Sequence, residues 1–239
     1  MVTTISEIAD ATGLITALAP GGAAVTIRTP LVEDESHWFL RAVREGVVSF
    51  IECPTGCFRT KKWGKAGPDH FDTPAGKPRH LFSKPVGPEA WLNREYVPHI
   101  AAYAYLILAE EYDRSASSFS RYRKYSRDLI SKRVGSSYET DPEFYNPDGS
   151  LHLQVEAKAS QAQTSRLAAA IEAHSNLVDL PESAVKEVEY VLDLGPRYLW
   201  IVGPGSIDPP LHVYEVSVNG LNAHFHPVSA IPAPPTLAL

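Results

Sequence analysis

The strongest constraint on the fold of this chain is a turn, Asn146-Pro147-Asp148-Gly149, that separates two strand-like segments. Proline at the second position, and glycine where a positive φ is favoured, are typical of a type I turn with a following bulge. Such a turn often closes an antiparallel hairpin. A helix-like segment, residues 161–175, follows the second strand. We therefore expect residues 136–175 to fold as strand, tight turn, strand and helix.

The strand after the turn alternates with period two over Leu151–Lys158. Its apolar residues are Leu151, Leu153, Val155 and Ala157, and its polar residues are His152, Gln154, Glu156 and Lys158. Successive side chains of a strand point to opposite faces. We therefore expect one face to pack inward and the other to present polar groups.

Acidic residues on the first strand are expected to face this polar row. The turn places Glu156 opposite Glu139 and Gln154 opposite Asp141, and a bulge would shift this register by one residue. Glu143 has the same parity as Glu139 and Asp141. Like charges directly across a sheet are destabilising, so these acids are either tolerated in solvent or neutralised by a cation. Carboxylates without Cys or several His residues suit a hard ion such as Mg²⁺.

The segment Glu156-Ala157-Lys158 places an acid two residues before a lysine, inside a hairpin strand and before an amphipathic helix. This arrangement resembles the PD-(D/E)XK nuclease superfamily, which includes restriction endonucleases. The resemblance implies an α/β fold in which a central mixed sheet is flanked by helices. This would be a restriction-endonuclease-like core with an N-terminal α/β elaboration. It also implies that a further strand, here Arg197–Val202, lies beside the acid-x-Lys strand.

The resemblance implies an activity and roles for three residues. The activity is hydrolysis of DNA phosphodiester bonds by a Mg²⁺-dependent endonuclease, with Mn²⁺ able to substitute. Glu156 would bind the metal, and Lys158 would orient or polarise the attacking water. Gln161, at the start of the helix, would support the lysine or the phosphate.

The identity of the first acid is open between three residues. Pro147-Asp148 matches the letters of the family motif. Yet a turn residue would lie some ~25 Å from Glu156 along an extended strand, at roughly 3.3 Å per residue, which is too far to share an ion. Geometry favours Asp141 as catalytic residue and metal ligand, with Glu139 as the alternative. Asp148 becomes the ligand only if the strands pair differently.

A local excess of basic residues precedes the hairpin, on a helix expected over residues 118–132. The residues expected to contact nucleic-acid phosphates are Arg121, Arg123, Lys124 and Arg127. Phe119, Tyr122 and Tyr125 are interleaved with them. The alternative is a solvated helix face whose aromatic residues pack inward.

The other elements follow from hydrophobic periodicity and from turn residues. Helices are expected at residues 5–18, 33–45, 96–112 and 181–194, and strands at 24–28, 47–53, 57–63, 80–83, 211–218 and 221–228. Residues 64–88 are rich in Gly and Pro and are expected to form a long loop with the one strand at 80–83. Ser160 is the expected N-cap of the helix after Lys158. Its packing stripe is Thr164, Leu167, Ala168 and Ile171.

We expect one domain of residues 1–239. It would comprise an N-terminal elaboration (1–95), a nuclease-like core (96–230) and a frayed Pro-rich tail (231–239). The formal net charge of -6 argues against a generally basic nucleic-acid coat, although not against a local patch. No segment reaches the roughly 18 apolar residues that a membrane span needs. We therefore expect a cytoplasmic protein with reduced thiols, with DNA as partner, no membrane association, and a homodimer left open.

Two other readings stay open. A chain with this fold could serve as a non-catalytic module for protein assembly or nucleic-acid binding. Alternatively, Glu156 and Lys158 are a surface pair in an unrelated protein, in which case Asp141 would lie far from Glu156 with no cleft between them. Cys53 and Cys57 could form half of a zinc site completed by His70 or His80, but two ordinary thiols beside a turn are expected.

Overall fold

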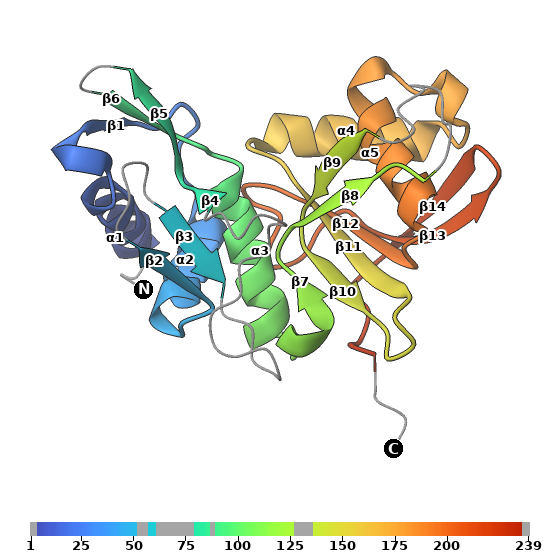
Figure 1. Ribbon diagram of the computed structural model, residues 1–239, viewed down its shortest axis with the longest axis horizontal. Helices are drawn as coiled ribbons and strands as arrows, with labels where there is room; N and C mark the ends of the chain where they lie inside the picture. The colour runs from blue at the N-terminus through green and yellow to red at the C-terminus, as the bar shows by residue number, and fades with distance from the viewer. Residues whose placement is uncertain (1–3, 52–56, 61–78, 87–88, 127–135, 236–239) are drawn as a thin grey trace.

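The computed structural model describes residues 4–51, 57–60, 79–86, 89–126 and 136–235. It shows a mixed α/β fold built on a six-stranded mixed sheet (Figure 1). The order of its strands is β14 (Asn222–Val228), β13 (Val213–Asn219), β12 (Tyr198–Val202), β11 (Leu151–Ala157), β10 (Glu143–Tyr145) and β7 (Ser117–Ser118). The coarse prediction of a central mixed sheet flanked by helices is confirmed.

Helices cover both faces of this sheet. The side chains of α3 (Tyr96–Leu108) pack with those of one face, and α4 (Gln161–Ala173) and α5 (Glu182–Leu194) pack with the other. As a result all seven residues of β11 are buried, including the polar residues His152, Gln154 and Glu156. Both faces of the strand therefore pack against other elements, whereas only one was expected to pack inward. Glu156, from the expected polar row, still lines a cavity.

The connection from β11 through α4 to β12 was predicted correctly. Strand β12 lies beside β11, as expected for residues 197–202, and the structure shows that the two strands are parallel. The Ser160 hydroxyl accepts a hydrogen bond from the backbone N–H of Gln163, so it caps α4 as predicted. The expected stripe of α4, from Thr164 to Ile171, is buried. At the end of β12, a Cβ on Gly203 would lie 2.1 Å from the Thr164 hydroxyl, so only glycine allows this close packing.

The hairpin turn is also where it was predicted, but the register of the strands differs. Gly149 has φ +82° and donates its N–H to the carbonyl of Asn146. Tyr145 pairs with Leu151 and Phe144 with Leu153, which leaves His152 in a bulge. Glu143 therefore stands opposite Gln154, where Asp141 was expected. Irregularity on the β11 side moves the register by two residues, more than the one allowed for.

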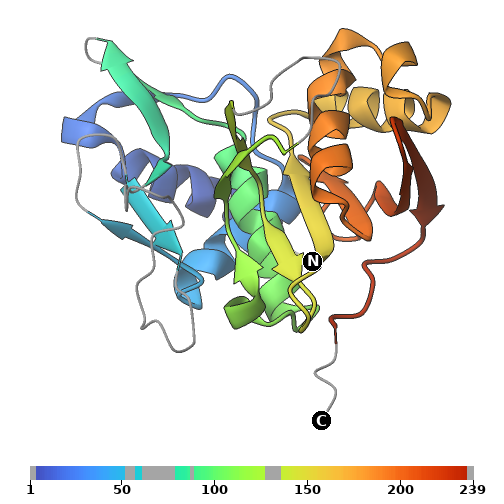
Figure 2. The same ribbon diagram turned by 45° about the vertical axis from the view of Figure 1, so that its right-hand side comes forward.

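The helix predicted over residues 118–132 is wrong. Residues 121–124 form strand β8 (Arg121–Lys124), which pairs with β9 (Ser137–Thr140) in an antiparallel ribbon. Serine and aromatic residues have weak helix propensity, and pairing with β9 satisfies the backbone instead. Residues 127–132 lie outside the described part of the chain. Figure 1 shows this yellow-green ribbon between α3 and α5 (orange), and in Figure 2 the ribbon crosses in front of α3.

The N-terminal part adds two helices and two small sheets. Helices α1 (Thr4–Ala17) and α2 (Glu33–Arg44) agree with the predicted ranges. One sheet has the order β1 (Ala24–Thr26), β6 (Glu89–Leu92), β5 (Phe82–Val86), and the other β2 (Val48–Ile51), β3 (Cys57–Thr60), β4 (Arg79–His80). Strand β6 was not expected. Of the predicted Gly- and Pro-rich loop, residues 64–78 and 87–88 lie outside the described residues.

The N-terminal elements share one hydrophobic core with α3 and the sheet. This core runs from Ala11 on α1 to Ile231 near the C-terminus. Ile231 is buried, and the Tyr112 hydroxyl donates a hydrogen bond to the Pro232 carbonyl. The described part of the tail is thus packed on the core, contrary to the prediction of a frayed segment.

Candidate functional site

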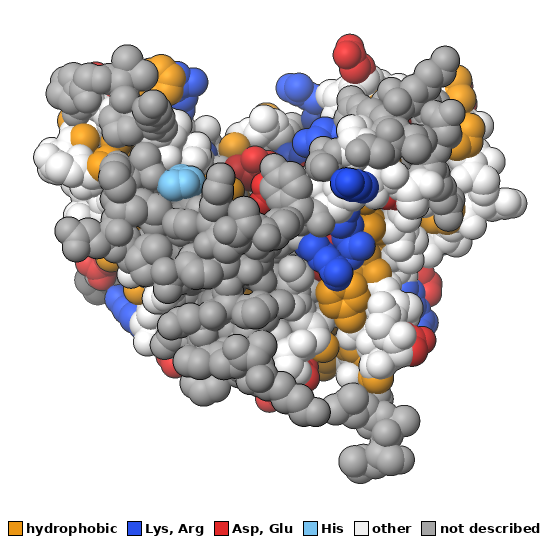
Figure 3. All heavy atoms as spheres, in the orientation of Figure 1, with side chains coloured by type: hydrophobic (Ala, Val, Ile, Leu, Met, Phe, Trp, Pro, Cys, Tyr) orange, Lys and Arg blue, Asp and Glu red, His pale blue; other side chains and the backbone are white. Residues whose placement is uncertain are grey.

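A cavity of about 520 Å³ opens where α3, β9, β11 and α5 approach one another. The described charged or titratable residues that line it are Arg94, Glu95, Tyr96, His99, Glu139, Asp141, Glu156, Lys158, Lys186 and Tyr190. In the space-filling view, acidic side chains lie in a hollow and basic side chains gather to one side of it (Figure 3). Asp141, Glu139, Glu156 and Lys158, which the sequence singled out, are therefore brought together.

Asp141 is held firmly at the wall of this cavity. It follows β9 directly, and its Oδ2 accepts a hydrogen bond from the backbone N–H of Ala157 at 2.7 Å. His99 Nδ1 lies 3.3 Å from its Oδ1, while His99 Nε2 lies 2.8 Å from the Phe119 carbonyl. Since a carbonyl only accepts, Nε2 carries a hydrogen, and the contact with Asp141 needs one more proton on either partner. Burial, and then the charge of Glu95, raise the pKa of Asp141 to about 7.

Glu156 projects from β11 beside Asp141. Lys158 Nζ lies 2.7 Å from its Oε1 and 2.8 Å from Oε1 of Glu187, which comes from α5. Burial raises the pKa of Glu156 to about 7, with Asp141 and Glu187 adding to the rise and Lys158 opposing it. Burial disfavours the ammonium of Lys158, but the two carboxylates outweigh this and raise its pKa above the usual value.

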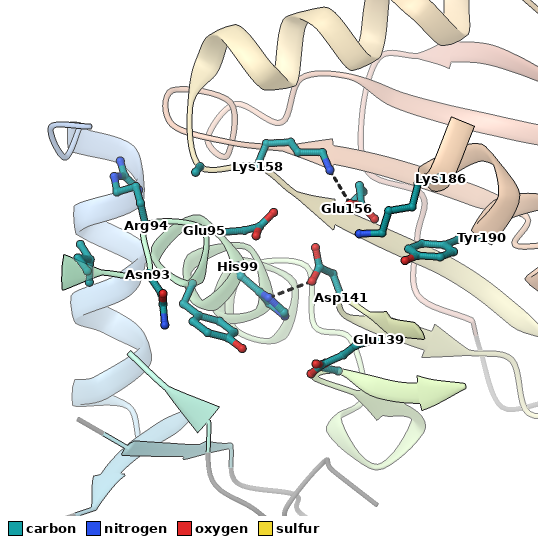
Figure 4. Close-up of a pocket in the computed structure, with 14 residues that line it drawn as sticks. Asn93, Arg94, Glu95, His99, Glu139, Asp141, Glu156, Lys158, Lys186 and Tyr190 are labelled. Atoms are coloured by element: carbon teal, nitrogen blue, oxygen red, sulfur yellow. Dashed lines mark hydrogen bonds and ion pairs between the residues drawn. The ribbon is translucent and has the colours of Figure 1, made fainter. Parts of the chain in front are cut away.

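Glu95 is a site residue that the sequence reasoning missed. It stands at the N-terminal boundary of α3 and points into the cavity between Lys158 and His99 (Figure 4). Glu95 is exposed at the mouth of the cavity, yet loss of hydration beside the cavity walls raises the pKa of its carboxyl. The charge of Glu156 raises this pKa further. The available signal was an acid immediately before an apolar helix.

The other predicted acids separate into three situations. Glu139 lines the cavity from β9, and the Ser120 hydroxyl donates to it at 2.6 Å. Glu143 is fully buried and bound by Arg123 in a bidentate pair with distances of 2.9 and 2.7 Å, so it leaves the predicted acidic row. Asp148 is exposed in the turn, where hydrogen bonds from Ser150 lower its pKa. It does not line the cavity, which favours Asp141 over Asp148.

Of the predicted basic residues, the described ones are not part of the cavity lining, and neither is Gln161. Arg121 is exposed and donates to the Tyr145 hydroxyl at 3.1 Å, and Lys124 is exposed. Arg123 is committed to Glu143, and Arg127 lies outside the described residues. Gln161 is exposed in the first turn of α4. Their assignment to phosphate contact or catalysis stays a prediction.

Most of the cavity residues that could bind a metal would do so through carboxylate oxygens. Among the described residues, no three His, Cys, Asp or Glu side chains are already gathered as around a bound ion. Loss of hydration is nevertheless the main cause that raises the pKa values of Asp141, Glu156 and Glu95, and neighbouring carboxylates raise them further. Such a donor set fits a hard divalent cation. Cys53 and His70, from the alternative zinc site, lie outside the described residues.

Comparison of the chain with known protein families, curated proteins and solved structures identified no relative. Within the described ranges, no helix has both the length and the apolar character needed to cross a bilayer.

Proposed function

We propose that this chain is a Mg²⁺-dependent nuclease that hydrolyses DNA phosphodiester bonds on a restriction-endonuclease-like core. One observation carries the proposal. Asp141, anchored on the backbone of Ala157, lines the same cavity as Glu156 and Lys158. The parallel pairing of β12 with β11, the acid-x-Lys strand, across a connection that contains α4 and α5, supports the fold part of the proposal.

Three carboxylates supply the oxygen ligands for the ion in this proposal. Asp141 and Glu156 would hold it, with Glu95 or Glu139 as a further ligand. When bound, the ion supplies positive charge beside the phosphate and a water molecule of lowered pKa. The hydrogen bond from Ala157 fixes the Asp141 carboxylate before any ligand arrives, which reduces the cost of ordering the site.

Lys158 is the group that would act on the reacting phosphate. Its ammonium lies at the cavity wall, held by Glu187 from the side of α5. An ammonium at this position can orient the attacking water and stabilise negative charge that develops on the phosphate. Glu187 positions Lys158 for this role without itself lining the cavity.

Isosteric variants test the proposal. We expect Asp141→Asn, Glu156→Gln and Lys158→Met each to lower Mg²⁺-dependent cleavage of linear duplex DNA at least about a hundredfold, as for loss of a group that stabilises transition-state charge. The measurement is the initial cleavage rate, with urea unfolding to verify the fold of each variant. Wild-type rates in all three folded variants would refute the assignment.

Asp148→Asn is the matched control, because it makes the same change in the same hairpin. Asp148 is exposed and outside the cavity lining, so its variant should cleave at the wild-type rate. If Asp148→Asn were inactive while Asp141→Asn cleaved normally, the first metal ligand would be Asp148.

A non-catalytic nuclease-fold module is the second candidate. Two observations favour it. Lys158 is already engaged in ion pairs with Glu156 and Glu187, and no three metal-ligating side chains are grouped together among the described residues. Calorimetric titration with Mg²⁺ and Mn²⁺ separates the two. Absence of binding at millimolar ion would favour the non-catalytic module.

A further inference from the structure

Lys186 lines the cavity and forms no ion pair with a carboxylate of the described residues. It is an exposed residue of α5, and its side chain points into the cavity (Figure 4). The cavity's other basic side chains are occupied: Lys158 by Glu156 and Glu187, and Arg94 by the buried Glu35. To the described residues, Lys186 makes neither an ion pair nor a hydrogen bond.

Aromatic packing sets the position of Lys186. Its Nζ lies 5.3 Å from the ring centroid of Tyr190, one helical turn further along α5. Tyr190 is buried and stacks on Tyr138 of β9, with the ring centroids 4.3 Å apart. The Tyr138 hydroxyl in turn donates to Asp193 of α5 at 2.8 Å. The ammonium of Lys186 therefore lies over an aromatic ring that is itself fixed between α5 and β9.

We propose that Lys186 binds a phosphate of the nucleic-acid strand that enters this cavity, on the α5 side of the carboxylates. The inference rests on the proposed function for its ligand. Asp141, Glu156 and Glu95 repel a polyanion by themselves, so a strand that lies across them needs positive charge close beside them. An unpaired ammonium held over an aromatic ring supplies a point charge of the right sign for phosphate.

Equilibrium binding of fluorescein-labelled DNA, measured by anisotropy in EDTA over a series of salt concentrations, tests the proposal. Lys186→Met keeps the aliphatic stem over Tyr190 and removes the charge. We expect its affinity to fall by about tenfold, as for loss of one charge-assisted hydrogen bond. The slope of log affinity against log salt should become smaller by about one, since one phosphate contact is lost.

Two variants serve as controls. Lys186→Arg keeps the charge and should restore both the affinity and the slope. Arg166→Met removes an exposed cation from the neighbouring helix α4, outside the cavity lining, and should change neither. Equal effects of Lys186→Met and Arg166→Met would mean that only overall charge matters, and would overturn the proposal. So would a loss of affinity that follows a loss of thermal stability.

Parallel assays separate this inference from the proposed function. Wild-type cleavage of DNA with an unchanged KM in Lys186→Met would overturn the phosphate site and leave the nuclease intact. DNA binding that needs Lys186, without cleavage by the wild type, would support the site and refute catalysis. Titration with inorganic phosphate, followed by the NMR shifts of α5, distinguishes a general anion site from one that needs a nucleic-acid strand. A wild-type protein that binds no DNA would overturn both.

Discussion

At the residue scale, the two central carboxyl groups hold protons up to nearly neutral pH. Burial is the main cause of the rise in pKa to about 7, for Asp141 from 3.8 and for Glu156 from 4.5. Each carboxyl would lose its proton at a lower pH in the unfolded chain. At pH values between the unfolded and the folded pKa, the folded protein binds more protons than the unfolded chain, so its stability falls as the pH rises.

We therefore predict that the free energy of unfolding, without divalent ions, decreases from about pH 5 to about pH 7 and then levels off. The Asp141→Asn, Glu156→Gln double variant should show a flatter profile, because the two groups that titrate are gone. Under the proposed function Mg²⁺ would bind the ionised carboxylates, so its stabilising effect should be larger at pH 8 than at pH 5. Urea unfolding at a series of pH values measures all three, and a wild-type stability that rises over this range would contradict the argument.

At the element scale, Arg123 ties strand β8 to a buried carboxylate of the main sheet. The Arg123 guanidinium reaches across to Glu143 of β10, whose carboxylate also accepts from the Thr140 hydroxyl at 2.7 Å and from Tyr145. We predict that Arg123→Met costs about 3 kcal/mol or more of stability, since it leaves a buried carboxylate without its cation. Arg121→Met, on the same strand, should cost less than about 0.5 kcal/mol. Denaturant midpoints of the two variants decide this, and equal values would contradict it.

The sequence predicted the elements with strong local signals and missed those set by pairing. A few neighbouring residues are enough to determine the turn at 146–149, the helix cap at Ser160 and the apolar strand at 197–202. Residues 121–124 do not, because their strand conformation depends on pairing with β9, which comes later in the chain. The bulge at His152 has no sequence mark either, yet it decides which acid stands opposite Gln154. Asp141 was found through the turn geometry, whereas Glu95 is close to Glu156 only through the tertiary packing of α3.

At the scale of the whole molecule, the N-terminal elements support the cavity from outside. Arg94, the residue before Glu95, lies buried against Glu35 of α2, with Nη1 2.8 Å from Oε2. Its other donors reach the carbonyls of Thr29 and Pro30 at 2.9 and 3.0 Å. The start of α3 is thereby fixed to the N-terminal part of the chain.

We predict that Arg94→Met lowers the free energy of unfolding by about 3 kcal/mol or more, because Glu35 loses its partner in the core. It should also weaken Mn²⁺ binding, since Glu95 is no longer held at the cavity. Arg44→Met is the control: its pair with Asp10 is exposed and 3.9 Å long, so it should cost less than about 0.5 kcal/mol. Urea unfolding and calorimetry measure the two effects. Unchanged Mn²⁺ affinity in folded Arg94→Met would show that the N-terminal part does not support the site.

The position of Lys158 between Glu156 and Glu187 has a consequence for how such a protein matures. The Lys158 ammonium neutralises part of the negative charge of these carboxylates. The chain can therefore fold around them without a bound metal ion. Under the proposed function, folding of the chain and binding of the ion would be separate events. An ion bound by Glu156 would displace Lys158 from that carboxylate, and Lys158 would keep its contact with Glu187. Lys158 would thus neutralise the carboxylates before the ion binds and act on the phosphate afterwards.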